Sequence, residues 1–288
     1  MINRRDFVRN ATLGLAAVVV SRGPEPTFAN PYDLPIGLQL YTVRRQMAKD
    51  PEETLKKVAE IGYEEVETDA PSIPKLAPIL KRTGLTAPSA HFNFGQVKAV
   101  WEEEVKHAKA QGIKYMVISF IDPPDRKSLE DYKTIAKLFN KAGQQCQRAG
   151  IQFCYHNHNF EFIEFGGGIG YDVLLKETDP KLVKFQLDCF WMTHAGHDPV
   201  EYMQKYPGRF PILHIKDLKK GIPSSTSFSN PMGIPFTEVG RGVIDWKRIF
   251  VAAKKGGLER YFVEQDEGDI PAFEAIKISY DYLHNLTV

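Results

Sequence analysis

The fold is decided by residues 113–158, which read IKYMVISFIDPPDRKSLEDYKTIAKLFNKAGQQCQRAGIQFCYHNH. This stretch begins with a short apolar run, 113–120, and continues through a long helical pattern that Ser128 can cap and Gly150 can end. A second apolar run follows at 151–156. Two buried strands joined by a helix are typical of a parallel sheet, because parallel neighbours need a long crossover connection.

The same alternation continues over almost the whole chain after residue 30. Apolar runs that predict strands lie at 36–41, 63–67, 85–91, 113–120, 151–156, 183–188, 210–214 and 261–264. Helical patterns follow them at 51–62, 74–82, 97–111, 128–149, 171–176, 198–205, 244–255 and 270–286, and the Pro-, Gly- and Ser-rich segment 219–238 predicts a loop. Repeated strand–helix units without a linker predict an α/β fold, a closed (β/α)8 TIM barrel built as a single domain from residues 30–288.

The composition agrees with one large domain that acts on a small molecule. The 288 residues are 43% hydrophobic and carry a formal net charge of +1. A charge near zero gives no long-range attraction for nucleic acid or anionic lipid, so we expect neither as a partner. Three scattered cysteines, Cys146, Cys154 and Cys189, do not make a disulfide framework. The sequence does not distinguish a monomer from a homo-oligomer.

Residues 1–29 have the layout of a cleavable export signal. Arg4 and Arg5 precede an apolar run, 11–20, and small residues follow up to Ala29. The adjacent arginines resemble a twin-arginine signal, which predicts a periplasmic mature protein. The apolar run is shorter than the ~20 residues of a spanning helix, so we expect no membrane span after processing. The alternative is an amphipathic first helix of the fold.

Polar residues that can bind a metal end four of the later apolar runs. His156 ends 151–156, Asp188 ends 183–188, His214 ends 210–214 and Glu264 ends 261–264. The carboxyl ends of the strands are where a (β/α)8 barrel carries its active site, so these side chains are expected to converge. His158 shares a strand face with His156, and the sequence leaves open which of the two is the ligand.

Two imidazoles and two carboxylates suit one divalent ion, and Mn²⁺, Co²⁺, Fe²⁺ or Zn²⁺ fit this set better than Mg²⁺. A substrate with adjacent carbonyl and hydroxyl oxygens can chelate such an ion, which makes the C–H between them more acidic. The residues alone therefore predict a metal-dependent enzyme that acts on a sugar.

Five short motifs also resemble one known family, the sugar phosphate isomerases/epimerases with a xylose isomerase-like TIM barrel. The motifs are GLQLYTVR (37–44), YHNHNFEF (155–162), LDCFW (187–191), LHIKD (213–217) and FVEQD (262–266). The resemblance implies that Asp188, His214 and Glu264 bind the metal. The epimerases of this family carry a glutamate at the position that His156 occupies here. The histidine puts in doubt an epimerisation that uses two symmetric glutamates.

The resemblance implies that Glu264 removes a proton next to a carbonyl, and His156 or His158 can serve on the opposite side because an imidazole titrates near neutral pH. Related barrels imply two alternatives to an isomerase or epimerase: a lyase or hydrolase of 3-keto-glycosides, and a dehydratase of keto-inositol. A non-catalytic carbohydrate-binding barrel is a further alternative.

Four other residues are expected to line the substrate pocket. Tyr41 and His91 end the first and third apolar runs, and Trp191 follows Asp188 closely enough to stack on a sugar face. Lys216 shares an inward strand face with His214 and can hold an oxyanion or a phosphate.

Overall fold

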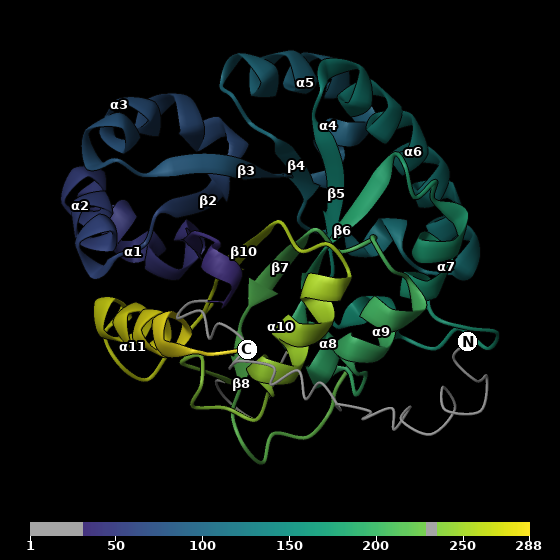
Figure 1. The fold of residues 1–288 in the computed structure, drawn as a ribbon. Helices are drawn as coiled ribbons and strands as arrows, with labels where there is room; N and C mark the ends of the chain where they lie inside the picture. Colours follow the sequence, from purple (N-terminus) through teal and green to yellow (C-terminus); the bar gives the residue numbers. More distant parts are fainter. Residues whose placement is uncertain (1–30, 229–234) are drawn as a thin grey trace, which may run out of the picture.

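The computed structural model describes residues 31–228 and 235–288, and the expected export signal lies outside them. Eight parallel strands form a closed barrel in the order β1-β10-β7-β6-β5-β4-β3-β2, which confirms the predicted (β/α)8 fold (Figure 1). The barrel strands are β1 (Ile36–Gln39), β2 (Glu65–Asp69), β3 (Thr86–Phe92), β4 (Tyr115–Ile118), β5 (Gln152–His156), β6 (Val183–Asp188), β7 (Ile212–Ile215) and β10 (Arg260–Val263).

Helices surround the strands on the outside (Figure 1). They are α1 (Arg44–Met47), α2 (Pro51–Ile61), α3 (Ile73–Thr83), α4 (Phe94–Ala99), α5 (Trp101–Ala110), α6 (Leu129–Ala149), α7 (Gly170–Glu177), α8 (Cys189–His194), α9 (Pro199–Lys205), α10 (Trp246–Lys255) and α11 (Ala272–Asn285). Short 3-10 turns are η1 (Pro31–Asp33), η2 (Leu40–Val43), η3 (Ala70–Ser72), η4 (Pro123–Asp125) and η5 (Phe160–Phe162).

The helix that the sequence marks most clearly, α6, forms as its caps predict. The Ser128 hydroxyl accepts a hydrogen bond from Asp131 N, and Gly150 ends the helix with a φ of 78° that glycine adopts without strain. Its buried side includes Tyr132, Phe139 and Cys146. The three cysteines are free and buried, in agreement with a fold held by its core.

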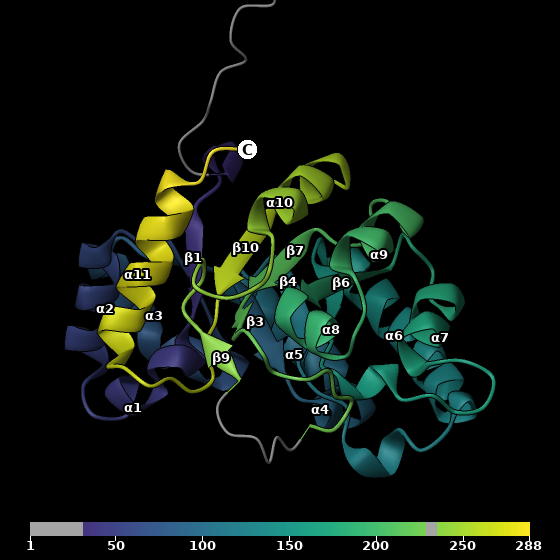
Figure 2. The ribbon, with the colours of Figure 1, turned by 90° about the horizontal axis from the view of Figure 1, so that it is seen from below.

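Two segments differ from the sequence prediction. The helix expected at 97–111 is divided into α4 and α5, because Val100 leaves the helical region with φ −134° and ψ 19°. The predicted loop 219–238 contains β9 (Phe236–Thr237), which pairs antiparallel with β8 (Asp217–Leu218). Figure 2 shows β9 at the lower end of the barrel.

Asp217 explains how this segment is held in place. Its buried carboxylate accepts hydrogen bonds from Gly240 N (2.9 Å), Gly242 N (3.2 Å), Ile244 N (3.2 Å) and Trp246 Nε1 (2.9 Å). A carboxylate that accepts several N–H groups anchors a loop firmly, since each bond is charge-assisted. The chain between β9 and α10 is thereby fixed beside β8.

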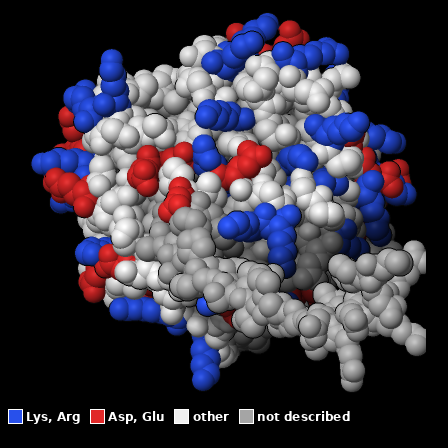
Figure 3. Space-filling view, in the orientation of Figure 1, with Lys and Arg blue, Asp and Glu red and all other residues white. Residues whose placement is uncertain are grey.

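The surface agrees with the weak net charge. On the face drawn in Figure 3, Lys and Arg side chains are interspersed with Asp and Glu. Within 31–228 and 235–288, no helix is long and apolar enough to cross a membrane.

Candidate metal centre

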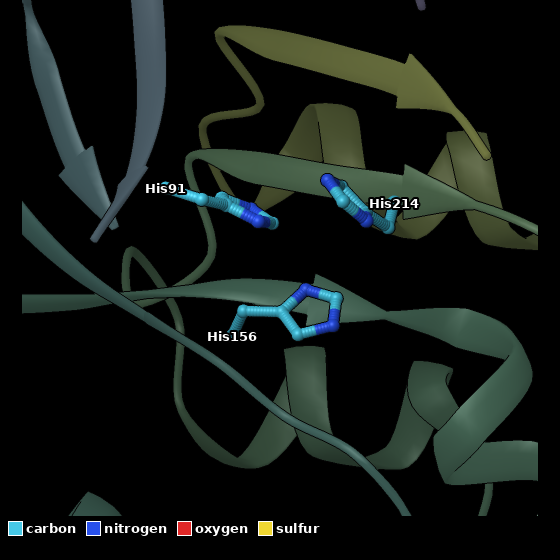
Figure 4. A group of neighbouring side chains, drawn as sticks. All are labelled: His91, His156 and His214. Carbon is cyan, nitrogen blue, oxygen red and sulfur yellow. The ribbon is translucent and has the colours of Figure 1, made fainter. Parts of the chain in front are cut away.

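Side chains from several strands meet at the carboxyl end of the barrel. Figure 4 shows the rings of His91 from β3, His156 from β5 and His214 from β7 pointing toward one another. Strand pairing explains the convergence, because the register places Asp188 of β6 beside His214, and Glu264 follows β10 directly.

The structure brings the four predicted ligands together. One donor atom from each of His156, Asp188, His214 and Glu264 lies within 4.8 Å of the others, and all four residues are buried. Asp188 Oδ2 is 4.0 Å from His156 Nε2 and 3.9 Å from His214 Nδ1. Glu264 Oε2 is 3.1 Å from His214 Nδ1. This arrangement of two imidazoles and two carboxylates matches the ligand types that borderline divalent metals prefer.

Asp188 carries the clearest sign that a cation belongs here. Its Oδ1 accepts a hydrogen bond from Trp191 N (2.7 Å), whereas Oδ2 is buried and has no hydrogen-bond partner among the described residues. The nearest cation is Lys216, whose Nζ is 3.5 Å away. A buried carboxylate oxygen that accepts no hydrogen bond is costly, and a divalent ion between Asp188 and the two imidazoles would satisfy it.

The hydrogen bonds behind the two imidazoles set their tautomers for metal binding. His214 Nε2 lies 2.7 Å from Glu67 Oε1, and His156 Nδ1 lies 3.1 Å from Gln186 Oε1. The Gln186 amide is oriented by its own Nε2, which donates to Glu67 Oε2 (2.8 Å). Each ring therefore donates to an oxygen behind it, and the opposite nitrogens, His214 Nδ1 and His156 Nε2, face Asp188 as metal ligands do.

Glu67 is the central residue that sequence reasoning missed. It is fully buried in β2 and also accepts hydrogen bonds from Gln39 Nε2 (2.9 Å) and Ser89 Oγ, while His91 Nε2 lies 2.9 Å from its Oε1. Burial alone would raise the pKa of Glu67, but His91 and His214 hold it well below the usual value. The available signal was a glutamate on the inward face of a strand.

The charges at the centre depend on one another. Burial raises the pKa of Asp188 to about 6. Burial would raise the pKa of Glu264 too, but Lys216 and His214 hold it well below its usual value. For His214 burial lowers the pKa, yet Glu67 and Glu264 raise it to about 10. A proton on His214 thus balances the carboxylates when no metal is bound, and a metal would replace that proton.

Lys216 is the main cation of the site. It is almost fully buried, and its Nζ lies 2.8 Å from Glu264 Oε2 and 2.9 Å from Asp266 Oδ1. Burial would lower the pKa of Lys216, but Asp266, Glu264 and Asp188 raise it well above its usual value. The permanent ammonium keeps Glu264 ionised and fixes its side chain.

A cavity of about 1050 Å³ opens above the four clustered side chains. The four expected pocket residues, Tyr41, His91, Trp191 and Lys216, all line it, together with His158. His91 also takes part in the network behind the ligands, because its Nε2 lies 2.9 Å from Gln186 Oε1.

His156 and His158 differ in their surroundings. Both ring nitrogens of His156 face partners at the centre, whereas His158 Nδ1 is buried without a hydrogen-bond partner in the described part of the chain. The His158 ring stacks on Phe160, with centroids 5.2 Å apart, and its backbone N donates to Glu161 Oε2 (2.9 Å). Burial lowers the pKa of both histidines, so both are neutral at pH 7. The geometry therefore suits His156 as a ligand and His158 as a proton carrier.

The fold and this cluster define a (β/α)8 barrel with polar groups gathered at the strand ends. The chain belongs to the xylose isomerase-like TIM barrel family, whose model matches residues 55–285.

Individual relatives agree with this assignment. An inosose dehydratase from Geobacillus thermodenitrificans (strain NG80-2) is 28% identical over 227 residues, which cover 68% of this chain and 75% of that enzyme. A sugar phosphate isomerase/epimerase from Parabacteroides distasonis ATCC 8503 is 26% identical, with a TM-score of 0.73 over 86% of this chain and 96% of that one. The IOLI protein, crystallised with a bound zinc atom, shares the fold at 16% identity, with a TM-score of 0.67 over 86% of this chain and 96% of that one.

Proposed function

We propose that the protein is a metal-dependent isomerase or epimerase of a sugar or keto-sugar, and that it begins by removing a proton next to a carbonyl. The observation that carries this proposal is the buried Asp188 Oδ2, which accepts no hydrogen bond from the described residues and faces His156 Nε2 and His214 Nδ1 beneath an open cavity. The names of the relatives, which include a sugar phosphate isomerase/epimerase and an inosose dehydratase, support a carbohydrate as the substrate.

One divalent ion held by His156, Asp188, His214 and Glu264 would supply positive charge beside the substrate carbonyl and acidify the neighbouring C–H. Mn²⁺, Co²⁺, Fe²⁺ and Zn²⁺ suit this set better than Mg²⁺, which prefers oxygen ligands.

Glu264 is the proposed base. Both of its contacts, with His214 and Lys216, use Oε2, which leaves Oε1 as the oxygen that can reach a substrate carbon in the cavity. Lys216 and His214 hold the pKa of Glu264 low, so the residue is present as a carboxylate, the form that a base requires. Lys216 keeps the residue in place during the transfer.

His158 is the proposed partner on the other side of the substrate. It follows β5, the third strand from β10 around the barrel, so it approaches the cavity from a different side than Glu264. Its neutral ring and unpartnered Nδ1 allow it to take up one proton and then return it. The His158 imidazole and the Glu264 carboxylate, on opposite sides of the substrate, would then take the roles that two glutamates have in a symmetric epimerisation.

The second candidate is a lyase that eliminates a leaving group after the same first step. The 28% identity to an inosose dehydratase favours it, since a dehydratase expels water from the carbon beside the carbanion. In that reaction the proton taken up by Glu264 would pass to the leaving oxygen, so that water departs and the carboxylate is regenerated.

The test is incubation of the metal-loaded protein with simple ketoses and 3-keto-glycosides in deuterated water, followed by mass and NMR analysis of substrate and product. We expect deuterium at the carbon next to the carbonyl for an isomerase or epimerase, and an unsaturated or cleaved product for a lyase. Glu264→Gln should lose exchange by several orders of magnitude in preparations that retain metal, since the amide cannot accept the proton. Turnover of a substrate without exchange and without loss of that C–H would refute proton abstraction.

A further inference from the structure

The cavity extends well beyond the four clustered ligands. Its volume of about 1050 Å³ slightly exceeds the roughly 300–1000 Å³ of pockets that enclose drug-sized ligands. A single sugar ring is smaller than such ligands. A single ring bound at the metal ligands would leave part of the cavity empty, which we call the unused side. The residues that line this unused side indicate which further groups the substrate has.

The unused side lies across the barrel mouth from His156 and Asp188 and beside β10, the strand that precedes Glu264. In the order β1-β10-β7-β6-β5-β4-β3-β2, β1 stands opposite β5 and β2 stands opposite β6. The segments after β1 and β2 contribute cavity residues that we call the outer lobe: Tyr41, Arg44, Asp69, Ser72 and Lys75. His156 on β5 and Asp188 on β6 are thus separated from the outer lobe by the width of the mouth.

Tyr41 gives the outer lobe an aromatic platform. Tyr41 is 53% exposed, and the Arg44 guanidinium lies 4.1 Å from the centroid of the Tyr41 ring. Arg44 is itself fixed, because NH1 donates to Tyr41 O (2.9 Å) and Asp266 O (2.7 Å) and NH2 pairs with Glu267. An exposed ring held still by a cation offers an apolar face at little entropic cost.

The polar groups beside this platform suit hydroxyls rather than a phosphate. Asp69 accepts a hydrogen bond from Ser72 Oγ (2.8 Å) and keeps acceptor capacity for a ligand. Lys75 is exposed on the same wall of the cavity. Arg44 is already committed to Glu267, so Asp69 and Lys75 present one negative and one positive charge. Balanced charges with donors and acceptors match a neutral polyol.

From this arrangement we infer that the outer lobe binds a second sugar ring, stacked on Tyr41 and hydrogen-bonded to Asp69 and Lys75. The substrate is then a disaccharide or larger glycoside, whose reacting ring lies at the metal centre. The inference rests on the proposed function for the identity of the reacting ring, but the outer lobe can be tested by binding alone.

The experiment compares affinities of the full-length, metal-loaded protein for single and linked rings by calorimetry and ligand-observed NMR. The probes are glucose, 3-keto-glucose, glucose 6-phosphate, and glucose disaccharides with and without a 3-keto group. We expect the disaccharides to bind about tenfold tighter than the matching single rings, from one added stacking contact. Glucose 6-phosphate should show no such gain.

Variants locate the gain in the outer lobe. Tyr41→Ala and Lys75→Ala should each reduce disaccharide affinity, Tyr41→Ala by about tenfold, whereas Tyr41→Phe keeps the ring and the affinity. Lys81→Ala is the matched control, because Lys81 is an exposed lysine of the same helix α3 that does not line the cavity.

The outcomes separate this inference from the proposed function. Equal affinities for single and linked rings, a larger gain for glucose 6-phosphate, or disaccharide binding unchanged in Tyr41→Ala would each overturn the second-ring site. Tight, Tyr41-dependent disaccharide binding without any deuterium exchange would support the site and contradict the proposed reaction. Exchange with equal affinities would do the reverse.

Discussion

The buried carboxylate of Glu67 should be indispensable for the metal centre although it is not a ligand. The perturbation is Glu67→Gln, which keeps the size of the side chain and removes its charge. Glu67 Oε1 accepts from His214 Nε2 and Gln39 Nε2, and Oε2 accepts from Gln186 Nε2 and Ser89 Oγ. A glutamine offers only one acceptor oxygen in place of two.

The cost follows from the groups that lose a partner. With its oxygen toward His214 and Gln39, the new amide turns an N–H toward Gln186 Nε2, so two donors face each other. A buried donor left unpaired costs roughly 1–3 kcal/mol, and the loss of the charge-assisted bond from His214 costs a further ~1–2 kcal/mol. We therefore expect the free energy of unfolding to fall by about 2–5 kcal/mol.

Metal affinity should also fall, because Glu67 no longer fixes which ring nitrogen of His156 carries the proton. If the Gln186 amide turns over to relieve the clash, its NH2 faces His156 Nδ1, which must then accept. The proton moves to His156 Nε2, the nitrogen that faces Asp188. Loss of such a supporting hydrogen bond costs about 10–100-fold in metal affinity.

Urea unfolding of the metal-free protein, metal titration and ¹⁵N NMR of the histidine rings measure these effects. Glu65→Gln is the control: it removes a buried glutamate from the same strand, where the partner is Arg260 (3.0 Å) rather than a histidine. It should lower stability and leave metal affinity unchanged. Wild-type metal affinity and unchanged histidine tautomers in Glu67→Gln would refute the role of Glu67.

Two further predictions concern other parts of the chain. Burial raises the pKa of Glu161 to about 7, so the stabilising contribution of this residue is complete below the ordinary pKa near 4.5 and is lost as the pH rises through 7. Over this interval the free energy of unfolding should decline by up to about 3 kcal/mol. Urea unfolding at each pH measures the decline, which should be smaller in Glu161→Gln. Replacing Arg4 and Arg5 with lysines should leave full-length precursor in the cytoplasm by cell fractionation, and efficient export of that variant would contradict a twin-arginine signal.

The sequence could predict the barrel because strand and helix periods recur throughout the chain. The ends of the later strands could also be located, and this predicts that His156, Asp188, His214 and Glu264 lie at one edge of the barrel. Local patterns carry that information, since a strand of a parallel barrel is a short apolar run whose last residues face the mouth.

What the sequence did not reveal depends on contacts between distant residues. Glu67 lies close to two other glutamates, Glu64 and Glu65, and only the closed barrel shows that it meets His214. Asp217 is the last residue of the LHIKD motif, and nothing in the motif indicates that it accepts hydrogen bonds from four N–H groups of residues 240–246. The division of the helix at Val100 is likewise not predicted by the sequence, because the residue there is neither glycine nor proline.

The central claim is that one divalent ion is held by His156, Asp188, His214 and Glu264, and elemental analysis of purified protein tests it most directly. Wild-type protein and the Glu65→Gln control should each carry one transition-metal ion per chain after dialysis. The double variant Asp188→Ala, His214→Ala removes one carboxylate and one imidazole and should carry almost none, while circular dichroism shows that it remains folded. Full metal occupancy in that folded double variant would contradict the account.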